Sequence, residues 1–410
     1  MTRGRRGARR WALLLAALTL ASAAPARAGT AAPKPPRISA SAWILLDAED
    51  RARLAASDPN RSRAMASTTK LMTAYLALRE LPLDERLVAP RYHPIPGESL
   101  LGLEAGERIS VRDLLYGLLL PSGNDAAATL AVGVAGSTSR FVDEMNRAAR
   151  QLGLRRTSYA NPIGLDERGN DSSPRDLAAL TLDLRRRALF RQIVDTPRAT
   201  LRSGARRRTV VNHNDLIGEV PWINGVKTGY TADAGYVLVA TGTKKRVTLL
   251  SVVMGAPSIR ARDDDTLALL KYGFSLYRVE RPVRSGETLA HAGVADGERG
   301  LALAASRSLE TTVRRDQRSR VRVDAPRSLP APVRRGERIG RATVTVDGER
   351  VGRVPLVAAY TVRVAGAESL VARADGVLPG PRGVVWALAM AVVAAVGIGV
   401  VAAIARRRPD

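Results

Sequence analysis

The residues best suited to chemistry form a short stretch in which a lysine follows a serine by three positions. Ser67 and Lys70 precede an apolar run, residues 71–78, that is typical of a buried helix. We expect Ser67 at or just before the helix start, where its hydroxyl can cap free N–H groups, and Lys70 on the same face one turn away. A lysine whose pKa is lowered by burial or by a nearby cation can take the proton of a serine hydroxyl. The pair therefore predicts a nucleophile and its base, beside helix N–H groups that can stabilise negative charge.

Taken alone, this spacing is a weak signal, and a helix cap followed by a surface lysine explains it more simply. The composition strengthens the chemical interpretation, because almost all basic residues of this chain are arginine. Its lysines are Lys34, Lys70, Lys227, Lys244, Lys245 and Lys271. A titratable amine is one reason to keep a lysine in such a chain.

Two further motifs follow along the chain. Residues 122–124 read Ser-Gly-Asn, and residues 227–229 read Lys-Thr-Gly. On its own the first is typical of a turn and the second of a strand end. Because the two motifs follow Ser67 and Lys70 in this order along the sequence, the four features together indicate one catalytic site.

The composition limits the classes of protein to which the chain can belong. Its 410 residues are enough for two domains plus targeting segments. The net charge of +25 suits anionic lipid or wall polymer as a partner, and equally an arginine-rich composition without a specific partner. No basic stripe with interleaved aromatic residues is present, so we expect no nucleic-acid partner. Cysteine is absent and His93, His213 and His291 lack metal-ligand spacing, so we expect neither a metal nor an organic cofactor.

Both ends of the chain predict export and anchoring. Residues 1–28 read as a signal peptide, because an arginine-rich start precedes a short apolar run and a small-x-small cleavage site. Residues 384–404 carry no charge and are long enough to cross a membrane. The arginines of residues 405–410 predict a cytoplasmic tail. We therefore expect a single-pass protein of the cell membrane whose catalytic domain is extracytoplasmic.

The region between the first and third motifs is expected to be mostly helical. A capping pattern at residues 110–113 opens a helix that a proline ends. The Ser-Gly-Asn motif then lies on a tight loop, with Asn124 and Asp125 capping the alanine-rich helix that follows. Further helices are expected at residues 141–152 and from Ser173 onward.

Strands are expected on both sides of this helical region, with a hairpin turn at residues 242–245 and a closing helix at residues 266–277. The expected strands are residues 43–47, 53–56, 209–211, 225–228, 235–241 and 246–254. This order predicts an α+β domain with an all-helical insertion. The expected segments are the signal peptide, a linker (29–37), the catalytic domain (38–280), a small β-rich domain (281–372), a second linker (373–383), the transmembrane helix and the tail.

The contexts of the three motifs carry a family resemblance. The chain reads Ser-Thr-Thr-Lys-Leu-Met-Thr from Ser67, Ser-Gly-Asn-Asp-Ala-Ala from Ser122, and Lys-Thr-Gly-Tyr-Thr from Lys227. With these three motifs, the chain resembles the low-molecular-mass penicillin-binding proteins, the serine D-alanyl-D-alanine carboxypeptidases, and the resemblance covers residues 38–278. The resemblance implies a β-lactamase/DD-peptidase-like antiparallel sheet flanked by helices. It also implies removal of the terminal D-alanine from peptidoglycan stem peptides through an acyl-enzyme, with β-lactam antibiotics as covalent inhibitors.

The resemblance further implies a role for each motif residue. Ser67 would be the nucleophile, Lys70 its base, and Ser122 a proton relay to the leaving amine. Lys227 would help to keep Lys70 neutral, and Asn124 would orient the substrate amide and Lys70.

Substrate binding would fall largely to the third motif. Lys227 and Thr228 would bind the terminal carboxylate, and Gly229 would let the strand approach the substrate closely. The N–H groups of Ser67 and Tyr230 would form the oxyanion hole. Support roles are assigned to Asn161, Asp176 and Asn214.

Three alternatives remain beside the carboxypeptidase. A DD-endopeptidase or a serine β-lactamase can share the scaffold, and an inactive wall-binding scaffold protein can keep the fold. The intact Ser67, Lys70, Ser122 and Lys227 argue against the inactive protein. Class A β-lactamases use a glutamate in a Glu-x-x-Leu-Asn stretch, which residues 125–226 do not contain, and this argues against the β-lactamase.

Overall fold

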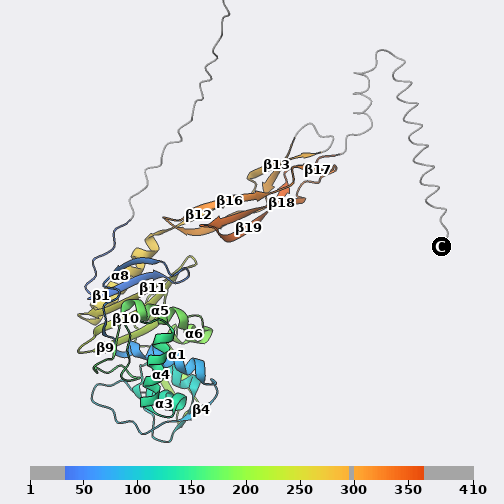
Figure 1. Cartoon of the computed structure of the whole chain (residues 1–410). Coiled ribbons are helices and arrows are strands. Elements are labelled where there is room, and N and C mark those ends of the chain that lie inside the picture. The colour runs from blue at the N-terminus through green and yellow to red at the C-terminus, as the bar shows by residue number, and fades with distance from the viewer. Residues whose placement is uncertain (1–32, 295–299, 364–410) are drawn as a thin grey trace, which may run out of the picture.

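The structure, a computed structural model, describes residues 33–294 and 300–363. It consists of a body of helices and strands, from one end of which an elongated arm of strands extends (Figure 1). The predicted signal peptide and the predicted transmembrane segment, residues 384–404, lie outside the described residues. Within the described ranges, no helix is both long enough and apolar enough to cross a bilayer.

A five-stranded antiparallel sheet forms the centre of the body, in the order β2-β1-β11-β10-β9. Its strands are β1 (Ala42–Asp47), β2 (Arg53–Ser57), β9 (Ile223–Thr231), β10 (Gly235–Lys244) and β11 (Val247–Ala256). Strand β1 pairs with β11, so the first strands of the chain lie beside the strands that follow the helical region. This closure confirms the prediction of one α+β domain with a helical insertion.

The sheet is buried on both faces, which explains why its central strands are almost continuously apolar. On one face Leu45, Leu249 and Val253 pack against α8 (Ile259–Ser275) in a core that includes Leu269. Side chains alternate along each strand, so neighbours such as Val252 point to the opposite face and join the larger core formed with the other helices.

The helical region begins with a single 3-10 turn and continues with seven helices in the described chain. These elements are η1 (Ala66–Thr69), α1 (Lys70–Glu80), α2 (Val111–Leu119), α3 (Asn124–Ala135), α4 (Thr138–Gln151), α5 (Pro174–Leu184), α6 (Ala188–Val194) and α7 (Leu216–Glu219). The predicted cap of α2 is confirmed, since Ser110 Oγ accepts a hydrogen bond from the N–H of Asp113. The helix expected from Ser173 onward is α5, and Ser173 Oγ accepts a hydrogen bond from the N–H of Asp176.

Residues of the loops before and between these helices form three short two-stranded antiparallel sheets. They are β3 (Arg63–Ala64) with β6 (Asp171–Ser172), β4 (Arg86–Val88) with β5 (Arg108–Ser110), and β7 (Arg198–Leu201) with β8 (Arg208–Val211). The predicted strand at residues 209–211 is therefore present, but it pairs with β7 in a separate hairpin outside the central sheet.

Away from the Ser67 turn, three predictions of caps, turns and helix bounds are wrong. Asn124 and Asp125 do not cap α3, because Gly123 occupies the N-cap position and makes no side-chain bond. The hairpin turn between β10 and β11 is not residues 242–245: β10 continues to Lys244, and the two-residue turn is Lys245–Arg246, both with positive φ. The closing helix was expected at residues 266–277, but α8 begins at Ile259, because Ser258 caps it there.

The arm contains the C-terminal strands and its own apolar core, which includes Leu303, Val344 and Leu356. A two-stranded sheet, β12 (Tyr277–Val283) with β15 (Leu309–Arg314), adjoins the body. A six-stranded sheet follows, of β13 (Thr288–Val294), β14 (Leu301–Ala305), β16 (Ser319–Asp324), β17 (Ser328–Leu329), β18 (Arg338–Val346) and β19 (Glu349–Ala358). The expected β-rich domain is thus present.

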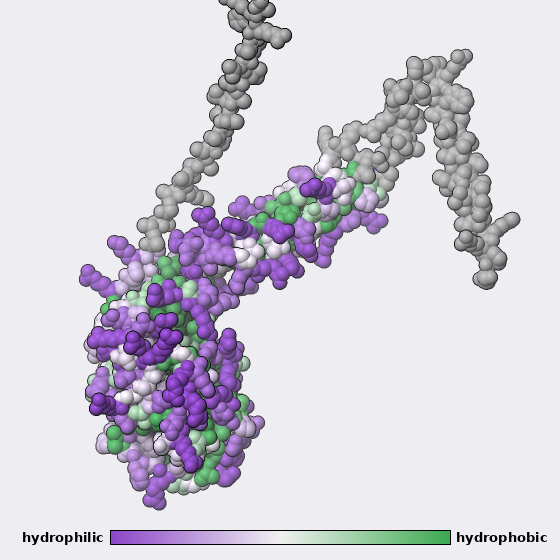
Figure 2. All heavy atoms as spheres, in the orientation of Figure 1, coloured by the Kyte–Doolittle hydropathy of each residue, from purple (hydrophilic) through white to green (hydrophobic). Residues whose placement is uncertain are grey.

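Polar contacts join the arm to the body at the turn between β1 and β2. Arg314 Nη1 lies 2.8 Å from Asp50 Oδ2, and the Tyr277 hydroxyl donates to Asp47. On the face shown in Figure 2, hydrophilic side chains cover most of both body and arm, with small apolar patches between them.

Candidate active site

Ser67 lies in the 3-10 turn η1, not in the first turn of the α-helix as the sequence suggested. Its hydroxyl caps no backbone N–H of the helix and instead lies 2.9 Å from Lys70 Nζ. The preceding residue, Ala66, has φ of 48°, a left-handed conformation that is uncommon for a residue with a side chain. The turn is therefore held in a special conformation at the point where the candidate nucleophile lies.

Strand β9 passes directly alongside this turn. A Cβ atom added to Gly229 would lie 3.0 Å from the backbone nitrogen of Ser67 and 3.0 Å from Ala66 Cβ. Any other residue at this position would push the strand away from the turn. The third motif is thereby brought against the first, although about 160 residues separate them in the sequence.

Lys70 begins α1 and is fully buried. Besides Ser67 Oγ, its Nζ contacts the carbonyl oxygen of Ile163 at 2.5 Å. Burial lowers the pKa of Lys70 well below its ordinary value, and the positive charge of Lys227 lowers it further, whereas Glu98 and Asp125 act in the opposite direction. A neutral amine at hydrogen-bond distance from a serine hydroxyl is the arrangement that proton abstraction needs.

The loop that supplies the Ile163 carbonyl is fixed from several sides. Asn161 Oδ1 accepts a hydrogen bond from the N–H of Gly164 at 2.7 Å, and Thr73 Oγ1 donates to the Pro162 carbonyl at 2.8 Å. Gly164 has φ of 90°, and a Cβ there would lie 2.1 Å from the Ala66 carbonyl oxygen. The loop therefore packs tightly on the Ser67 turn, which gives Asn161 a supporting position.

Ser122 and Asn124 lie on the loop between α2 and α3. Ser122 has φ of 66°, and its buried Oγ has no hydrogen-bond partner among the described residues. Asn124 Nδ2 donates to Glu98 Oε2 at 2.8 Å. The expected contact between Asn124 and Lys70 is not formed, since Lys70 Nζ bonds to Ser67 and Ile163 instead.

Lys227 lies in β9 and is buried, with its Nζ donating to the Thr228 carbonyl at 2.9 Å. Burial, helped by the charge of Arg262, lowers the pKa of Lys227 to about 7. Lys227 forms no ion pair with a carboxylate in the part of the chain that the structure describes. A buried amine without a carboxylate partner, beside the hydroxyl-bearing Thr228, is suited to receive an anionic group from a ligand.

The remaining candidate residues lie at the edges of this arrangement. Tyr230, at 58% exposure, stacks on Tyr236 with ring centroids 4.4 Å apart. Asn214 Nδ2 donates to the Gly225 carbonyl at 3.2 Å, which ties a loop to the start of β9. Asp176 accepts hydrogen bonds from the Arg156 N–H and the Thr157 hydroxyl, so its contacts are local to the start of α5.

Several participants were not predicted from the sequence. The Ile163 carbonyl carries no side-chain signal, and the Pro-Gly-Glu stretch that ends in Glu98 reads only as a turn. Arg262, near the start of α8, acts on Lys227 through its charge, and the sequence gives no sign of this interaction. Among residues 33–294 and 300–363, no group of three or more His, Asp or Glu side chains is placed to hold a metal ion.

Comparison with known families matches two parts of the chain. Residues 29–258 match the D-alanyl-D-alanine carboxypeptidase family, peptidase S11. Residues 277–363 match the C-terminal domain of penicillin-binding protein 5. The two matches are separated by α8, which begins directly after the first match and ends just before the second.

Individual proteins show the same likeness. The chain is 30% identical over 354 residues to D-alanyl-D-alanine carboxypeptidase DacA of Haemophilus influenzae, covering 81% of this chain and 87% of the relative. DacF of Bacillus subtilis is 29% identical, with 81% and 88% covered. Penicillin-binding protein 5 of Haemophilus influenzae superposes with a TM-score of 0.58 at 28% identity, covering 81% of this chain and 99% of that structure.

Proposed function

Because this chain belongs to the D-alanyl-D-alanine carboxypeptidase family, we propose that Ser67 is the nucleophile through which it acts. The chain is a serine-type D-Ala-D-Ala carboxypeptidase of the penicillin-binding protein group. The observation that carries the assignment of Ser67 is the 2.9 Å contact between its Oγ and the buried Nζ of Lys70.

The first half of the reaction forms an ester. Ser67 Oγ attacks the carbonyl carbon of the penultimate D-alanine while its proton passes to the neutral Lys70 amine. The C–N bond to the terminal D-alanine then breaks, and the leaving amine takes a proton through Ser122, whose buried hydroxyl has no partner among the described side chains. Water afterwards cleaves the ester and restores Ser67. The N–H groups of Ser67 and Tyr230 stabilise the oxyanion in both halves.

The third motif binds the end of the substrate that leaves. Lys227 and Thr228 take the free carboxylate of the terminal D-alanine, and Gly229 allows the substrate to lie close to β9. Asn124 receives the substrate amide. The substrates are accordingly peptidoglycan stem peptides, and β-lactams, whose carboxylate occupies the Lys227 position, acylate the same serine.

The reaction is tested by incubating the purified protein with isolated wall fragments and following them by mass spectrometry. Loss of one alanine from an uncrosslinked stem is the expected result. Cleavage of a crosslinked dimer without loss of alanine from single stems would instead show a DD-endopeptidase. No change in either fragment, together with no labelling by a fluorescent penicillin, would show an inactive scaffold.

Replacing Lys227 with alanine is expected to lower kcat/KM for a peptide with a free terminal carboxylate by about 10- to 100-fold, the effect of losing one charge-assisted contact. The same peptide with a terminal amide offers no carboxylate, so its slower turnover should fall only through the higher pKa of Lys70 that follows loss of the Lys227 charge, an effect that both peptides share. The measurement is the ratio of the two kcat/KM values in the wild type and in Lys227→Ala.

Lys271→Ala is the matched control, because Lys271 is an exposed lysine on α8. It should leave the ratio unchanged. If Lys227→Ala lowers the melting temperature strongly while the ratio per folded molecule stays normal, Lys227 is a structural lysine and its binding role is wrong.

We further propose that the chain is exported and held at the outer face of the cell membrane by residues 384–404. The support is the uncharged length of this segment, the arginines behind it and the signal-like residues 1–28. A variant of residues 29–380 should then stay in solution and keep its activity, whereas the full chain should sediment with membranes even in high salt. Release of the full chain by salt alone would show attachment by basic charge only, since salt screens such contacts.

A further inference from the structure

Glu98 is a partly buried carboxylate in the loop between β4 and β5 for which the proposed mechanism has no use. Its Oε2 accepts a hydrogen bond from Asn124 Nδ2 at 2.8 Å and one from the Tyr92 hydroxyl. Its Oε1 accepts one from the Ile95 N–H at 3.1 Å. One carboxylate thus joins its own loop to the asparagine of the second motif.

This contact determines which way the Asn124 amide faces. An ionised carboxylate can only accept hydrogen bonds, so Asn124 must turn its NH2 group, not its oxygen, toward Glu98. Partial burial raises the pKa of Glu98, but the hydrogen bonds from Tyr92, Asn124 and the Ile95 N–H outweigh this and keep the pKa below its ordinary value. Asn124 also interacts with the Tyr92 hydroxyl, so its amide hydrogens face Tyr92 and Glu98, and the oxygen Oδ1 is left for a ligand.

The loop that carries Glu98 is itself fixed to the start of α3. The N–H of Asn124 donates to the Ser99 carbonyl at 2.8 Å. Asp125 accepts hydrogen bonds from the N–H groups of three consecutive residues at 2.7–2.9 Å, and these residues are Leu101, Gly102 and Leu103. The loop and the Asn124 side chain therefore cannot shift independently.

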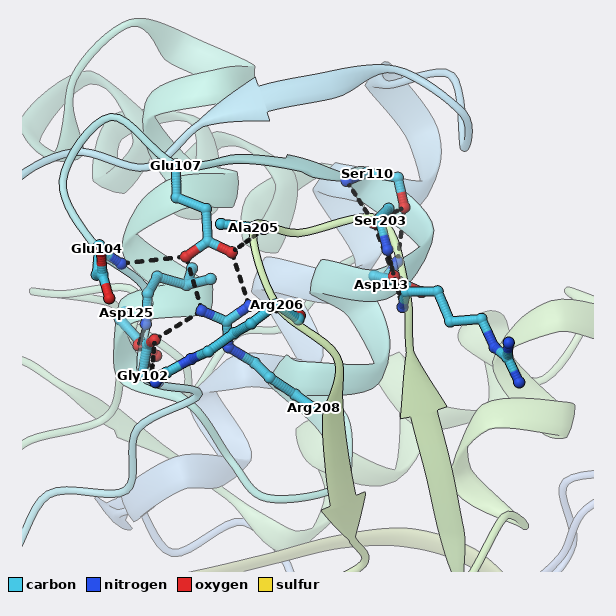
Figure 3. Close-up of polar contacts among 12 residues, drawn as sticks. Gly102, Glu104, Glu107, Ser110, Asp113, Asp125, Ser203, Ala205, Arg206 and Arg208 are labelled. Atoms are coloured by element: carbon cyan, nitrogen blue, oxygen red, sulfur yellow. Dashed lines mark hydrogen bonds and ion pairs between the residues drawn. The ribbon is translucent and has the colours of Figure 1, made fainter.

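A buried ion pair fastens the same loop on its other side (Figure 3). Arg208 of β8 lies 2.6 Å from Glu107 Oε1, and its Nη2 donates to the Gly102 carbonyl at 2.8 Å. Glu107 also accepts hydrogen bonds from the backbone N–H groups of Glu104 and Ala205. Although Arg208 Nε has no hydrogen-bond partner among the described residues, these contacts join Glu107 and Gly102 to β8, so the loop that carries Glu98 is supported on this side as well.

We propose that Glu98 is a positioning residue that fixes the side-chain amide of Asn124, so that its Oδ1 meets the peptide N–H of the substrate in one orientation. This rests on the proposed function, in which Asn124 receives the substrate amide. A peptide amide offers an N–H donor, which the remaining acceptor Oδ1 of Asn124 complements.

Glu98 also contributes charge to the site. Lys70 is faced by Lys227 from β9 and by the carboxylates of Glu98 and Asp125 from the loop and α3. Burial lowers the pKa of nearby His213, and the charges of both lysines lower it further. Removing the charge of Glu98 removes one of the two effects that raise the pKa of Lys70. The amine then loses its proton at lower pH, and the acid side of the kcat/KM profile shifts to lower pH.

The experiment uses Glu98→Ala, which removes the contact and the charge, and Glu98→Gln, which keeps an acceptor for Asn124 and removes only the charge. Glu104→Gln is the matched control, because it removes one charge from an exposed side chain of the same loop. The readouts are kcat and KM on a peptide ending in D-Ala-D-Ala, the pH profile, and labelling of Ser67 by penicillin.

We expect Glu98→Ala to lower kcat/KM about 10- to 100-fold, the cost of a misplaced substrate contact. In an Asn124→Ala background the same change should cost almost nothing more, because both act through one contact. Glu98→Gln should lose less activity and shift the acid side of the profile to lower pH. Glu104→Gln should match the wild type.

Wild-type kcat/KM in Glu98→Ala, or an equal loss with and without Asn124, would overturn the inference while leaving the nucleophile in place. An unshifted acid side in Glu98→Gln would likewise count against it. If the wild type itself neither releases D-alanine nor labels at Ser67, the proposed function fails and the inference fails with it.

Discussion

Replacing Ser67 with alanine is expected to abolish both the release of D-alanine and covalent labelling by penicillin. In the described chain, no other side-chain hydroxyl forms a hydrogen bond with Lys70 Nζ, so no second nucleophile has a base. Replacing Lys70 should cost nearly as much, because the members of one catalytic unit are not additive; we expect losses on the order of 10⁴-fold or more in kcat/KM. Labelling with a fluorescent penicillin and release of D-alanine measure the two consequences separately.

The choice of variants separates chemistry from folding. Lys70 is fully buried, so Lys70→Met, which keeps the volume and removes the amine, is preferable to alanine. Ser62→Ala is the control for Ser67, because Ser62 is an exposed serine whose hydroxyl donates only to the Arg156 carbonyl. Lys70→Met and Ser62→Ala should both melt close to the wild-type temperature. Penicillin labelling of Ser67→Ala would show that another residue is the nucleophile.

Patterns local in sequence predicted much of this fold. The cap at Ser110 follows from a serine placed three residues before an acidic residue, and the start of α5 follows from the proline in its first turn; both are present. The apolar strands at residues 235–241 and 246–254 pair in the central sheet because their length and composition suit burial on both faces. Chain order then required the sheet to close around the helical insertion.

The errors arose where tertiary contacts compete with local preference. Ser67 was expected to cap a helix, but β9 and the loop at Gly164 pack against its turn and hold it in a 3-10 conformation. Asp125 was expected to cap α3, but its carboxylate satisfies three N–H groups of a loop more than 20 residues away. Both residue types suit either role, so spacing alone could not decide between them.

The site shows the same division. The three motifs indicate the residues for which we propose reactive roles, because serine, lysine and asparagine have a recognisable chemistry and order. The contacts that position these side chains and shift their pKa values could not be predicted in the same way. A backbone carbonyl at Ile163 has no sequence signature, and the Glu98–Asn124 hydrogen bond joins two loops through a carboxylate that also suits a plain turn.

The rate at which water hydrolyses the penicilloyl ester distinguishes a penicillin-binding carboxypeptidase from a β-lactamase. This rate depends on whether a carboxylate near Ser67 can activate the water. A class A β-lactamase uses a glutamate to activate the water that frees the serine. In the described chain, the two carboxylates that act on Lys70 are Glu98 and Asp125. Asp125 is occupied by three backbone N–H groups, and the hydrogen bonds to Glu98 lower its pKa and make it a weak base. Neither is suited to take a proton from water.

We therefore expect the penicilloyl enzyme to persist for minutes or longer, whereas the D-alanyl-peptide ester turns over. After attack on a penicillin the leaving amine stays tethered to the acyl group and obstructs water, but free D-alanine diffuses away. Intact-protein mass spectrometry after one equivalent of benzylpenicillin should show a lasting mass increase on the peptide that contains Ser67, and none in Ser67→Ala. Rapid return to the free mass while penicilloate accumulates would mean that an unrecognised group activates water, and that hydrolysis of β-lactams is an activity of this site.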